Sequence, residues 1–410
     1  MKEYMTLGDV ELKGKTVLCR VDINCPIEPA SKKIKDDTRI RLHAGTTIKE
    51  LASKGAKTVV MSHQGRAGSK DFVSLEEHAR VLEKHLGHPV KFVDDIFGSR
   101  AREEIGKLKE GEVLMLENVR FYSEELLNRP ADAQANVFLV KKLAGVADYF
   151  VNDAFGTIHR SQPSLVGFGE VLPTLAGRVI EDELTSLDKV FNNAEKPIVF
   201  VLGGVKVKES LKVITNLMRN NIADTVLTGG LLGNLFLAAK GYTIGRRSME
   251  VLRGKEIDKL IPAAKDLIKS YEDRIETPVD VALVNGQREE IHVSELPTPY
   301  QIADIGRETV GRYCKIIEEA KTVVMNSPLG VYEKKEFIYG TDRILNEIAQ
   351  RNAYKIVGGG HVGDMVGRLD LGKKFSHVSS GGRATLYYLS GERTPVISML
   401  KKAKRNWKQV

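Results

Sequence analysis

Short apolar runs alternate along this chain with stretches in which apolar residues recur at helical spacing. The runs have the length and composition of buried strands, and the stretches between them have the period of amphipathic helices. This alternation is typical of a parallel sheet whose strands are joined by crossover helices. The first half predicts strands at Thr16–Val21, Thr58–Met61, Val90–Val93, Val113–Leu116 and Asp148–Val151. The second half predicts strands at Ile198–Leu202, Thr225–Thr228, Val281–Val284, Val323–Met325, Ile356–Val357 and Phe375–Val378.

Each half therefore predicts a doubly wound α/β lobe, and the expected fold class is α/β with two Rossmann-like parallel-sheet lobes. Between the halves, Leu184, Leu187 and Val190 recur at helical spacing, which predicts an amphipathic connecting helix. Ser74 and Glu77 have the spacing of a capping box for a helix that runs through Leu86. Gly55 and Gly87 stand where glycines end helices.

Composition narrows the class of protein without selecting a function. The chain has 410 residues, 42% of them hydrophobic, which predicts a globular protein of two or three domains. It contains no leader-like apolar segment and no run long enough to span a membrane, so we expect a cytoplasmic protein. A net charge of +8 is typical of proteins that bind nucleic acids or small polyanions. Only 6% of the residues are aromatic, which disfavours single-stranded nucleic acid as a partner.

Arginine and histidine residues follow the ends of the predicted strands in the first half. In open α/β sheets, ligands bind beyond the carboxyl ends of the strands. Arginine binds carboxylate and phosphate oxygens through two parallel hydrogen bonds, so we expect an anion pocket at this edge. The arginines are Arg20, Arg39, Arg66, Arg120 and Arg160, and His63 and His159 lie in the same loops.

Glycine clusters occupy the corresponding strand ends in the second half. Gly203 and Gly204 precede Lys206 at the start of a predicted helix, where backbone N–H groups bind phosphates. Gly358, Gly360 and Gly363 match a dinucleotide-binding fingerprint, which raises a nicotinamide-dependent dehydrogenase as an alternative. The acidic residue that this fingerprint expects at the end of the next strand is absent, so the match is weak. The alternative without catalysis is a basic nucleic-acid-binding protein.

Taken together, eight collinear segments resemble the phosphoglycerate kinase family. They are Arg20–Pro26, Asp37–Ile40, Ser62–Arg66, Glu117–Phe121, Asn152–Gly156 with His159 and Arg160, Gly203–Lys206, Asn326–Val331 and Ser376–Gly382. The resemblance implies reversible phosphoryl transfer between 1,3-bisphosphoglycerate and ADP, giving 3-phosphoglycerate and ATP with Mg²⁺. It also implies a phosphoglycerate-binding lobe at 1–172, a hinge helix at 173–193, a nucleotide-binding lobe at 194–391 and a C-terminal segment at 392–410 that returns to the first lobe.

The resemblance also implies the residues of each site. The expected phosphoglycerate site consists of Asp22, Asn24, Arg39, His63, Arg66, Arg120, His159 and Arg160. The expected nucleotide site consists of Gly203, Lys206, Gly229, Gly230, Asn326, Pro328, Glu333, Gly358, Gly359 and Gly360. The expected catalytic residues are Arg39, Lys206, Gly359 and Gly382. We expect the lobes to close on both substrates, and no nucleic acid or membrane to be bound. The resemblance leaves a monomer and a homodimer equally open.

Three positions depart from the usual family pattern. His361 stands where an aspartate near magnesium is common, Ser210 replaces a second nucleotide-phosphate lysine, and Arg383 replaces a glycine. These departures indicate an archaeal-type branch. Because His361 is a poor ligand for Mg²⁺, we expect Asp364, one helical turn further on, to contact the magnesium directly or through water.

Overall fold

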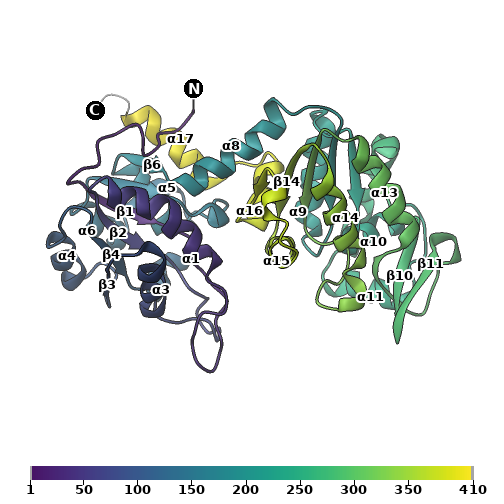
Figure 1. Ribbon diagram of the computed structural model, residues 1–410, viewed down its shortest axis with the longest axis horizontal. Coiled ribbons are helices and arrows are strands. Elements are labelled where there is room, and N and C mark those ends of the chain that lie inside the picture. Colours follow the sequence, from purple (N-terminus) through teal and green to yellow (C-terminus); the bar gives the residue numbers. More distant parts are fainter. Residues whose placement is uncertain (1, 408–410) are drawn as a thin grey trace. The chain divides into compact units, whose positions relative to one another are not determined.

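The computed structural model describes residues 2–407 and contains two compact units (Figure 1). One unit comprises Met1–Leu184 together with Arg393–Val410, and the other comprises Thr185–Glu392. The division falls inside the long helix α8 (Arg178–Asn192), which has Leu184, Leu187 and Val190 buried. The predicted amphipathic helix is therefore confirmed.

A six-stranded parallel sheet of order β3-β4-β2-β1-β5-β6 forms the centre of the first unit. Its strands are β1 (Thr16–Arg20), β2 (Lys57–Met61), β3 (Val90–Val93), β4 (Val113–Leu116), β5 (Tyr149–Asn152) and β6 (Thr174–Ala176). Its helices are α1 (Thr38–His43), α2 (Lys49–Ser53), α3 (Glu76–Leu86), α4 (Ser99–Gly106), α5 (Ala131–Ala135), α6 (Phe138–Ala144), α7 (Pro163–Val166) and α17 (Pro395–Trp407). A π-helical turn at Ala44–Ile48 joins α1 to α2.

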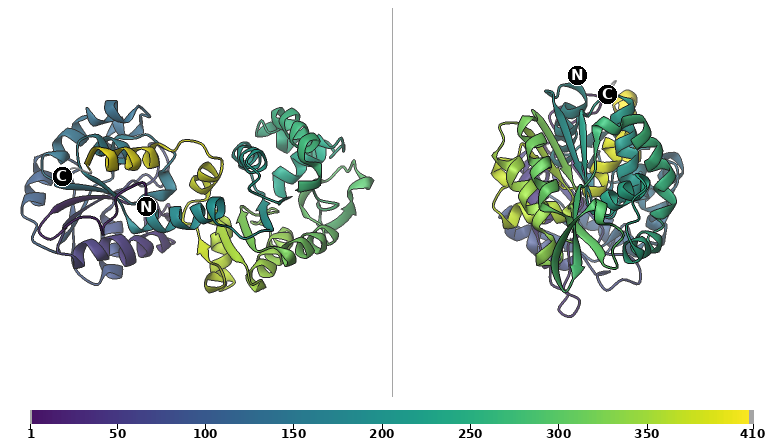
Figure 2. Two further views of the ribbon diagram at one scale, coloured as in Figure 1. Left: turned by 90° about the horizontal axis from the view of Figure 1, so that it is seen from above. Right: turned by 90° about the vertical axis from the view of Figure 1, so that its right-hand side faces the viewer.

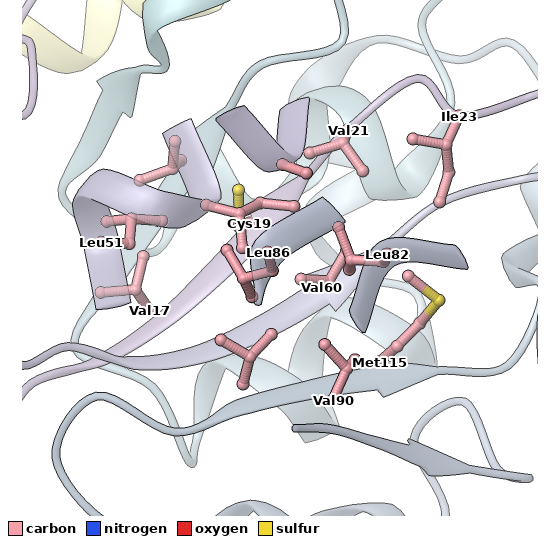
Figure 3. Close-up of a cluster of buried hydrophobic side chains, with 14 of the residues drawn as sticks. Val17, Cys19, Val21, Ile23, Leu51, Val60, Leu82, Leu86, Val90 and Met115 are labelled. Carbon is pink, nitrogen blue, oxygen red and sulfur yellow. The ribbon is translucent and has the colours of Figure 1, made fainter. Parts of the chain in front are cut away.

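One hydrophobic core lies between this sheet and helices α2 and α3 (Figure 3). Val17 and Cys19 of β1 point toward Leu51 of α2, and Leu82 and Leu86 of α3 close the cluster. Burying one side chain of this size contributes about 1.5–3 kcal/mol to folding. The core therefore holds the strand ends, and the loops that follow them, in fixed positions.

The C-terminal helix α17 packs on the first unit, far in sequence from most of it (Figures 1 and 2). The Lys402 ammonium lies 2.6 Å from a carboxylate oxygen of Glu170. Met399 packs so closely on Gly169 that a Cβ there would lie 2.2 Å from the methionine sulfur. The backbone N–H of Val396 donates to the carbonyl of Ile158 at 3.2 Å.

The second unit contains another six-stranded parallel sheet, of order β15-β14-β13-β7-β8-β9. Its strands are β7 (Ile198–Leu202), β8 (Thr225–Thr228), β9 (Ile275–Glu276), β13 (Thr322–Asn326), β14 (Tyr354–Gly358) and β15 (His377–Val378). Its helices are α9 (Val207–Arg219), α10 (Gly230–Ala239), α11 (Arg246–Gly254), α12 (Ile261–Tyr271), α13 (Arg307–Glu319), α14 (Tyr339–Gln350), α15 (Gly360–Arg368) and α16 (Gly382–Leu389). The expected α/β fold with two parallel sheets is confirmed.

A separate antiparallel sheet in the second unit was not predicted. Its strands are β10 (Asp280–Asn285), β11 (Gln287–His292) and β12 (Gln301–Ile305), in the order β11-β10-β12. The run at Val281–Val284 is thus a strand, as predicted, but it belongs to this sheet and not to the parallel one. An Asn-Gly pair is a common sequence signal for a hairpin turn, because such turns need a residue with positive φ. Asn285 and Gly286 form this turn here, and Gly286 has a φ of +70°.

Two local predictions were wrong. Residues 174–176, expected inside the connecting helix, form the edge strand β6 before α8 begins. The Ser74 hydroxyl accepts from the N–H of Glu76 instead of Glu77, so no capping box forms there. The helix-ending roles of Gly55 and Gly87 are confirmed by their φ values of +75° and +80°. None of the helices within residues 2–407 combines the length and apolar character needed to cross a membrane.

Candidate functional site

The residues expected to bind phosphoglycerate lie at the carboxyl edge of the first sheet. Parallel register places Arg20, the last residue of β1, beside Met61 of β2 and Asn152 of β5. The loops that leave these strands therefore begin at one edge. The β1 loop carries Asp22 and Asn24, the β2 loop carries His63 and Arg66, the β4 loop carries Arg120, and the β5 loop carries His159 and Arg160.

Arg39 is held by Asp22 at the start of α1. Its Nη1 donates to Oδ2 of Asp22 at 2.8 Å, and its side chain is 39% exposed. Burial disfavours the Asp22 carboxylate, but the positive charges around it, first that of Arg39 and also that of Arg20, outweigh this effect, so the pKa of Asp22 lies well below its usual range. A Cβ on Gly156 would lie 2.2 Å from Oδ2 of Asp22, so only glycine permits this packing.

His63 is buried and neutral. Arg20 approaches its Nδ1 with Nη2 at 3.0 Å, and a guanidinium can only donate, so Nδ1 accepts and the proton lies on Nε2. Burial, followed by the charge of Arg20, holds the pKa of His63 well below its usual range. This arrangement leaves His63 as a hydrogen-bond donor through Nε2.

Arg160, Arg20 and Arg66 lie near Arg120, together with the carboxylate of Glu125. Burial and the neighbouring charges of Arg160, Arg20 and Arg66 lower the pKa of Arg120 to about 10, although Glu125 opposes them. Arg120 donates to the carbonyl of Gly65 through Nη1. Within the described chain, no acceptor meets its buried Nε. Mutual repulsion of this kind favours the binding of an anion.

Arg20 is buried inside the first unit and does not present its guanidinium to solvent, which corrects the expectation that it lines an anion pocket. It is fully buried, and its Nε donates to Oγ of Ser164 at 2.8 Å. The Ser164 hydroxyl in turn donates to Glu125 at 2.6 Å. Glu125 and Ser164 were missed in the sequence, because nothing in their local pattern distinguishes them from surface residues.

Asn24 and His159 complete the set of residues in the loops at this edge of the sheet. The Asn24 side-chain oxygen accepts from the N–H of Gly65 at 2.9 Å, so it ties the β1 loop to the β2 loop. His159 is half-buried and adjoins Arg160. Arg66 is exposed. The structure thus brings the predicted residues of the first unit into one neighbourhood.

His43 connects the β1 loop, through Asp153, to the first turn of α8. Its Nε2 accepts from the N–H of Asp22 at 3.4 Å, and its Nδ1–H donates to Asp153 at 2.7 Å. The other Asp153 oxygen accepts from the N–H groups of Val179 and Ile180 at 2.9 and 3.3 Å. The sequence offered one signal for this buried residue, which is its position one helical turn after Arg39.

In the second unit, four helices begin at the carboxyl edge of the parallel sheet. Strands β7, β8, β14 and β15 lead into α9, α10, α15 and α16. The first N–H groups of a helix have no partner within the helix, and the helix dipole makes this end positive. An anion is therefore stabilised at this edge.

The glycines at these helix starts allow loops to pack backbone against backbone. A Cβ on Gly203 would lie 2.3 Å from the carbonyl oxygen of Pro328, and one on Gly230 would lie 2.8 Å from the nitrogen of Gly204. Gly230 also has a φ of +55° and donates to the carbonyl of Leu329 at 2.6 Å. These glycines are therefore required by chain packing.

The two expected catalytic glycines lie next to each other. A Cβ on Gly382 would lie 2.5 Å from Cα of Gly359, and Gly359 has a φ of +103°. Asn326 contacts both loops: its amide nitrogen donates to the carbonyl of Gly382 at 3.3 Å and would lie 2.8 Å from a Cβ on Gly358. The predicted glycines and Asn326 thus form one cluster.

Lys206 stands at the N-cap of α9, two residues after Gly204. Burial and the positive charge of Arg383 lower the pKa of its ammonium group, and Glu209 opposes them. The helix dipole also disfavours a cation at this position.

The loop that carries Asn326, Pro328 and Glu333 rests on the antiparallel sheet. Asp304 of β12 is buried and accepts from Arg288 of β11 at 2.8 Å and from the N–H of Gly340 at 2.9 Å. Burial raises the pKa of Asp304 to about 6, although both contacts favour its charged form.

Glycines again permit this packing, because a Cβ on Gly330 would lie 2.4 Å from an oxygen of Asp304. Sequence reasoning missed Arg288 and Asp304 together with the sheet itself.

Comparison with known proteins decides the family. A family model described as Phosphoglycerate kinase matches residues 7–392. The chain belongs to the phosphoglycerate kinase family. This membership also decides between the alternatives raised by the sequence, in favour of the kinase over the dehydrogenase and the nucleic-acid-binding protein.

Relatives within the family cover nearly the whole chain. Phosphoglycerate kinase from Methanothermobacter thermautotrophicus is 48% identical over 403 residues, which span 98% of each chain. That from Sulfolobus acidocaldarius is 44% identical over 399 residues, 96% of this chain and 95% of the relative. The crystal structure of phosphoglycerate kinase from Pyrococcus horikoshii OT3 has a TM-score of 0.91 and 41% identity, covering 98% of this chain and 100% of that chain. The relatives named Phosphoglycerate kinase are mostly archaeal, as the departures from the usual pattern indicated.

Two departures from the usual family pattern have visible consequences. Ser210 is buried on α9, so it offers no cation to a ligand. The His361 ring stacks on Tyr332, with ring centroids 4.1 Å apart and an interplanar angle of 23°. Burial, then the charges of Asp364 and Glu333, raise the pKa of Tyr332, so both carboxylates lie near this ring.

Proposed function

We propose that this chain transfers a phosphoryl group reversibly between 1,3-bisphosphoglycerate and ADP, giving 3-phosphoglycerate and ATP. The proposed setting is glycolysis and gluconeogenesis in the cytoplasm, with the chain acting as a monomer or a homodimer. The observation that carries the proposal is the grouping of Arg20, Arg66 and Arg160 around Arg120 in the first unit, where the buried Nε of Arg120 meets no acceptor among the described residues. An acidic three-carbon substrate with a carboxylate and a phosphate neutralises such a pocket.

In the first unit, Arg39 is proposed to orient the carboxyl group of the substrate. Its link to Asp22 fixes the direction of the guanidinium before the substrate arrives. The rest of the proposed phosphoglycerate site surrounds the phosphate and hydroxyl groups, with His63 donating through Nε2. These residues are Asp22, Asn24, His63, Arg66, Arg120, His159 and Arg160.

In the second unit, Lys206 is proposed to meet the transferring phosphoryl group. Little covalent chemistry is asked of the protein in such a transfer, so positioned cations and N–H donors stabilise the equatorial oxygens. Gly359 and Gly382 supply N–H groups at the starts of α15 and α16. The nucleotide is bound by Gly203, Gly229, Gly230, Asn326, Pro328, Glu333, Gly358, Gly359 and Gly360.

Direct transfer requires the two ligands to meet with water excluded. We therefore propose that the two units close on their substrates before the reaction. The acyl phosphate is then protected from hydrolysis, and the attacking oxygen of ADP is brought in line with it.

The expected Mg²⁺ fits a site made largely by the nucleotide. Within the described residues, no group of three or more His, Cys, Asp or Glu side chains could hold a metal ion. Mg²⁺ commonly binds through substrate phosphates, water and one or two carboxylates, and Asp364 near Tyr332 offers one carboxylate. When bound, Mg²⁺ would neutralise charge on the phosphates.

We predict that Asp364→Asn raises the Mg²⁺ concentration needed for half-maximal activity by about tenfold, since second-sphere ligands of metals are commonly worth 10- to 100-fold. Calorimetry of ADP binding at several Mg²⁺ concentrations provides a readout independent of activity. Asp370→Asn, just beyond the end of α15, is the matched control. An unchanged Mg²⁺ requirement in the Asp364 variant would remove this residue from the magnesium site.

A coupled assay tests the proposed function directly. Purified protein is supplied with 1,3-bisphosphoglycerate and ADP, and ATP formation is followed. The expected result is rapid ATP formation that depends on both substrates and on Mg²⁺. Absence of ATP formation by folded protein that still binds ADP would contradict the proposal.

A further inference from the structure

Arg383 lies where the first turns of two helices meet. It is the second residue of α16, and its Nη2 lies 3.2 Å from Oε1 of Glu209 in the first turn of α9. Its side chain is 49% exposed, whereas that of Glu209 is 18% exposed. The guanidinium group thus reaches from one helix start to the other.

This placement is electrostatically unfavourable for a cation. The N-terminal ends of α9 and α16 are both positive because of their unpaired N–H groups and their dipoles. Lys206 adds a second cation at the start of α9, and burial, followed by the charge of Arg383, lowers its pKa. One carboxylate, Glu209, faces these two cations and two helix ends.

A surface ion pair alone does not account for the arrangement. Exposed pairs between arginine and glutamate contribute little to stability, because solvent screens them and side-chain entropy is lost. The helix dipole stabilises an arginine near the C-terminal end of a helix and destabilises one near the N-terminal end, where Arg383 lies. At two helix starts, an additional anion is the partner that relieves the repulsion.

We propose that Arg383 binds a phosphate oxygen of the nucleotide, beside Lys206 and the N–H groups that begin α9 and α16. This inference rests on the proposed function, and it adds a phosphate-binding residue to the glycine cluster. Arginine has five N–H donors, so contact with Glu209 is compatible with contact to a phosphate. The contact with Glu209 involves Nη2, so other N–H groups of the guanidinium remain for a phosphate oxygen.

Calorimetric titration with ADP tests the inference on the full chain without phosphoglycerate. Arg383→Gln is expected to raise the Kd for ADP by about tenfold or more, the usual effect of losing a hydrogen bond to a charged group. Adenosine, which has no phosphate, is expected to bind the variant and the unchanged chain equally.

Two further variants separate binding from a purely structural role. Glu209→Gln removes the ion pair but keeps Arg383, so it should change the Kd for ADP far less than Arg383→Gln does. Arg246→Gln removes an exposed arginine paired with Glu250 in the same unit, and it should leave the Kd unchanged. Thermal unfolding of each variant reports whether folding is retained.

The outcomes distinguish the inference from the function on which it rests. If the unchanged chain binds ADP and Arg383→Gln binds it equally well, the inference is wrong and the function stands. If Glu209→Gln weakens ADP binding as much as Arg383→Gln does, the ion pair is structural and the inference is wrong. If the unchanged chain binds no ADP, the proposed function itself is overturned.

Discussion

Arg39→Ala is expected to lower kcat by about 10²–10³-fold, the range seen when one preorganised donor to the transition state is removed. Arg39 is directed by Asp22 through a 2.8 Å hydrogen bond, so its guanidinium is fixed before substrate binds. Loss of a fixed cation affects the transition state more than the ground state, where substrate charges are still partly solvated. Steady-state kinetics with both substrates varied separately provide the measurement.

The Kd for ADP should change little in this variant, because Arg39 and the glycine loops belong to different units. Arg41→Ala, two residues along the same helix and exposed, is the matched control and should leave kcat unchanged. Arg39→Lys should recover only part of the activity, because an ammonium cannot form two parallel bonds to a carboxylate. Unchanged turnover in Arg39→Ala would exclude Arg39 from catalysis.

The parallel sheets were predictable because most of their strands, such as β4, β7 and β8, are buried on both faces, although Lys91 of β3 is exposed. Val90–Val93, Val113–Leu116, Ile198–Leu202 and Thr225–Thr228 match β3, β4, β7 and β8 residue for residue. Such strands are continuous apolar runs with little polar sequence, and this signal is strong in a single sequence. The amphipathic helix α8 was predictable for a related reason. Burial of only one of its faces makes the apolar residues recur at helical spacing.

The antiparallel sheet was missed because its outer strand is polar. Residues 287–292 of β11 include Arg288, Glu289 and Glu290, and their side chains are partly or fully exposed. No apolar periodicity marks such a strand, and only the Asn285–Gly286 turn signals the hairpin. The edge strands β6 and β9 were missed because they contain three and two residues, which are too few to show a periodic pattern.

The site residues that sequence reasoning found are those placed directly at strand ends. Parallel topology brings such residues together regardless of their separation in sequence. The supporting residues His43, Ser164 and Glu125 lie within other elements, and their roles depend on which side chains the fold buries beside them. Arg20 shows the reverse case, in which a strand-end arginine is directed inward by Ser164. Side-chain direction of this kind follows from packing and is not encoded in local spacing.

Lys206→Ala is the second variant for which we expect a large loss, of about 10²–10³-fold in kcat. Lys206 stands at the N-cap of α9, where the helix dipole and Arg383 both disfavour its charge. The Lys206 ammonium is electrostatically destabilised in the free protein. It is stabilised most strongly when negative charge spreads over the oxygens of the transferring phosphoryl group. The effect should therefore appear mainly in kcat and less in the KM for nucleotide.

Lys206→Met removes the ammonium group but keeps an apolar side chain of similar length. Similar losses of kcat in Lys206→Ala and Lys206→Met would assign the effect to the charge. Lys208→Ala, exposed on the same helix, is the matched control and should retain full activity. Calorimetry with ADP separates the two possible roles of Lys206. If only the KM and the Kd for nucleotide rise while kcat is retained, Lys206 binds the ground-state nucleotide and does not stabilise the transition state.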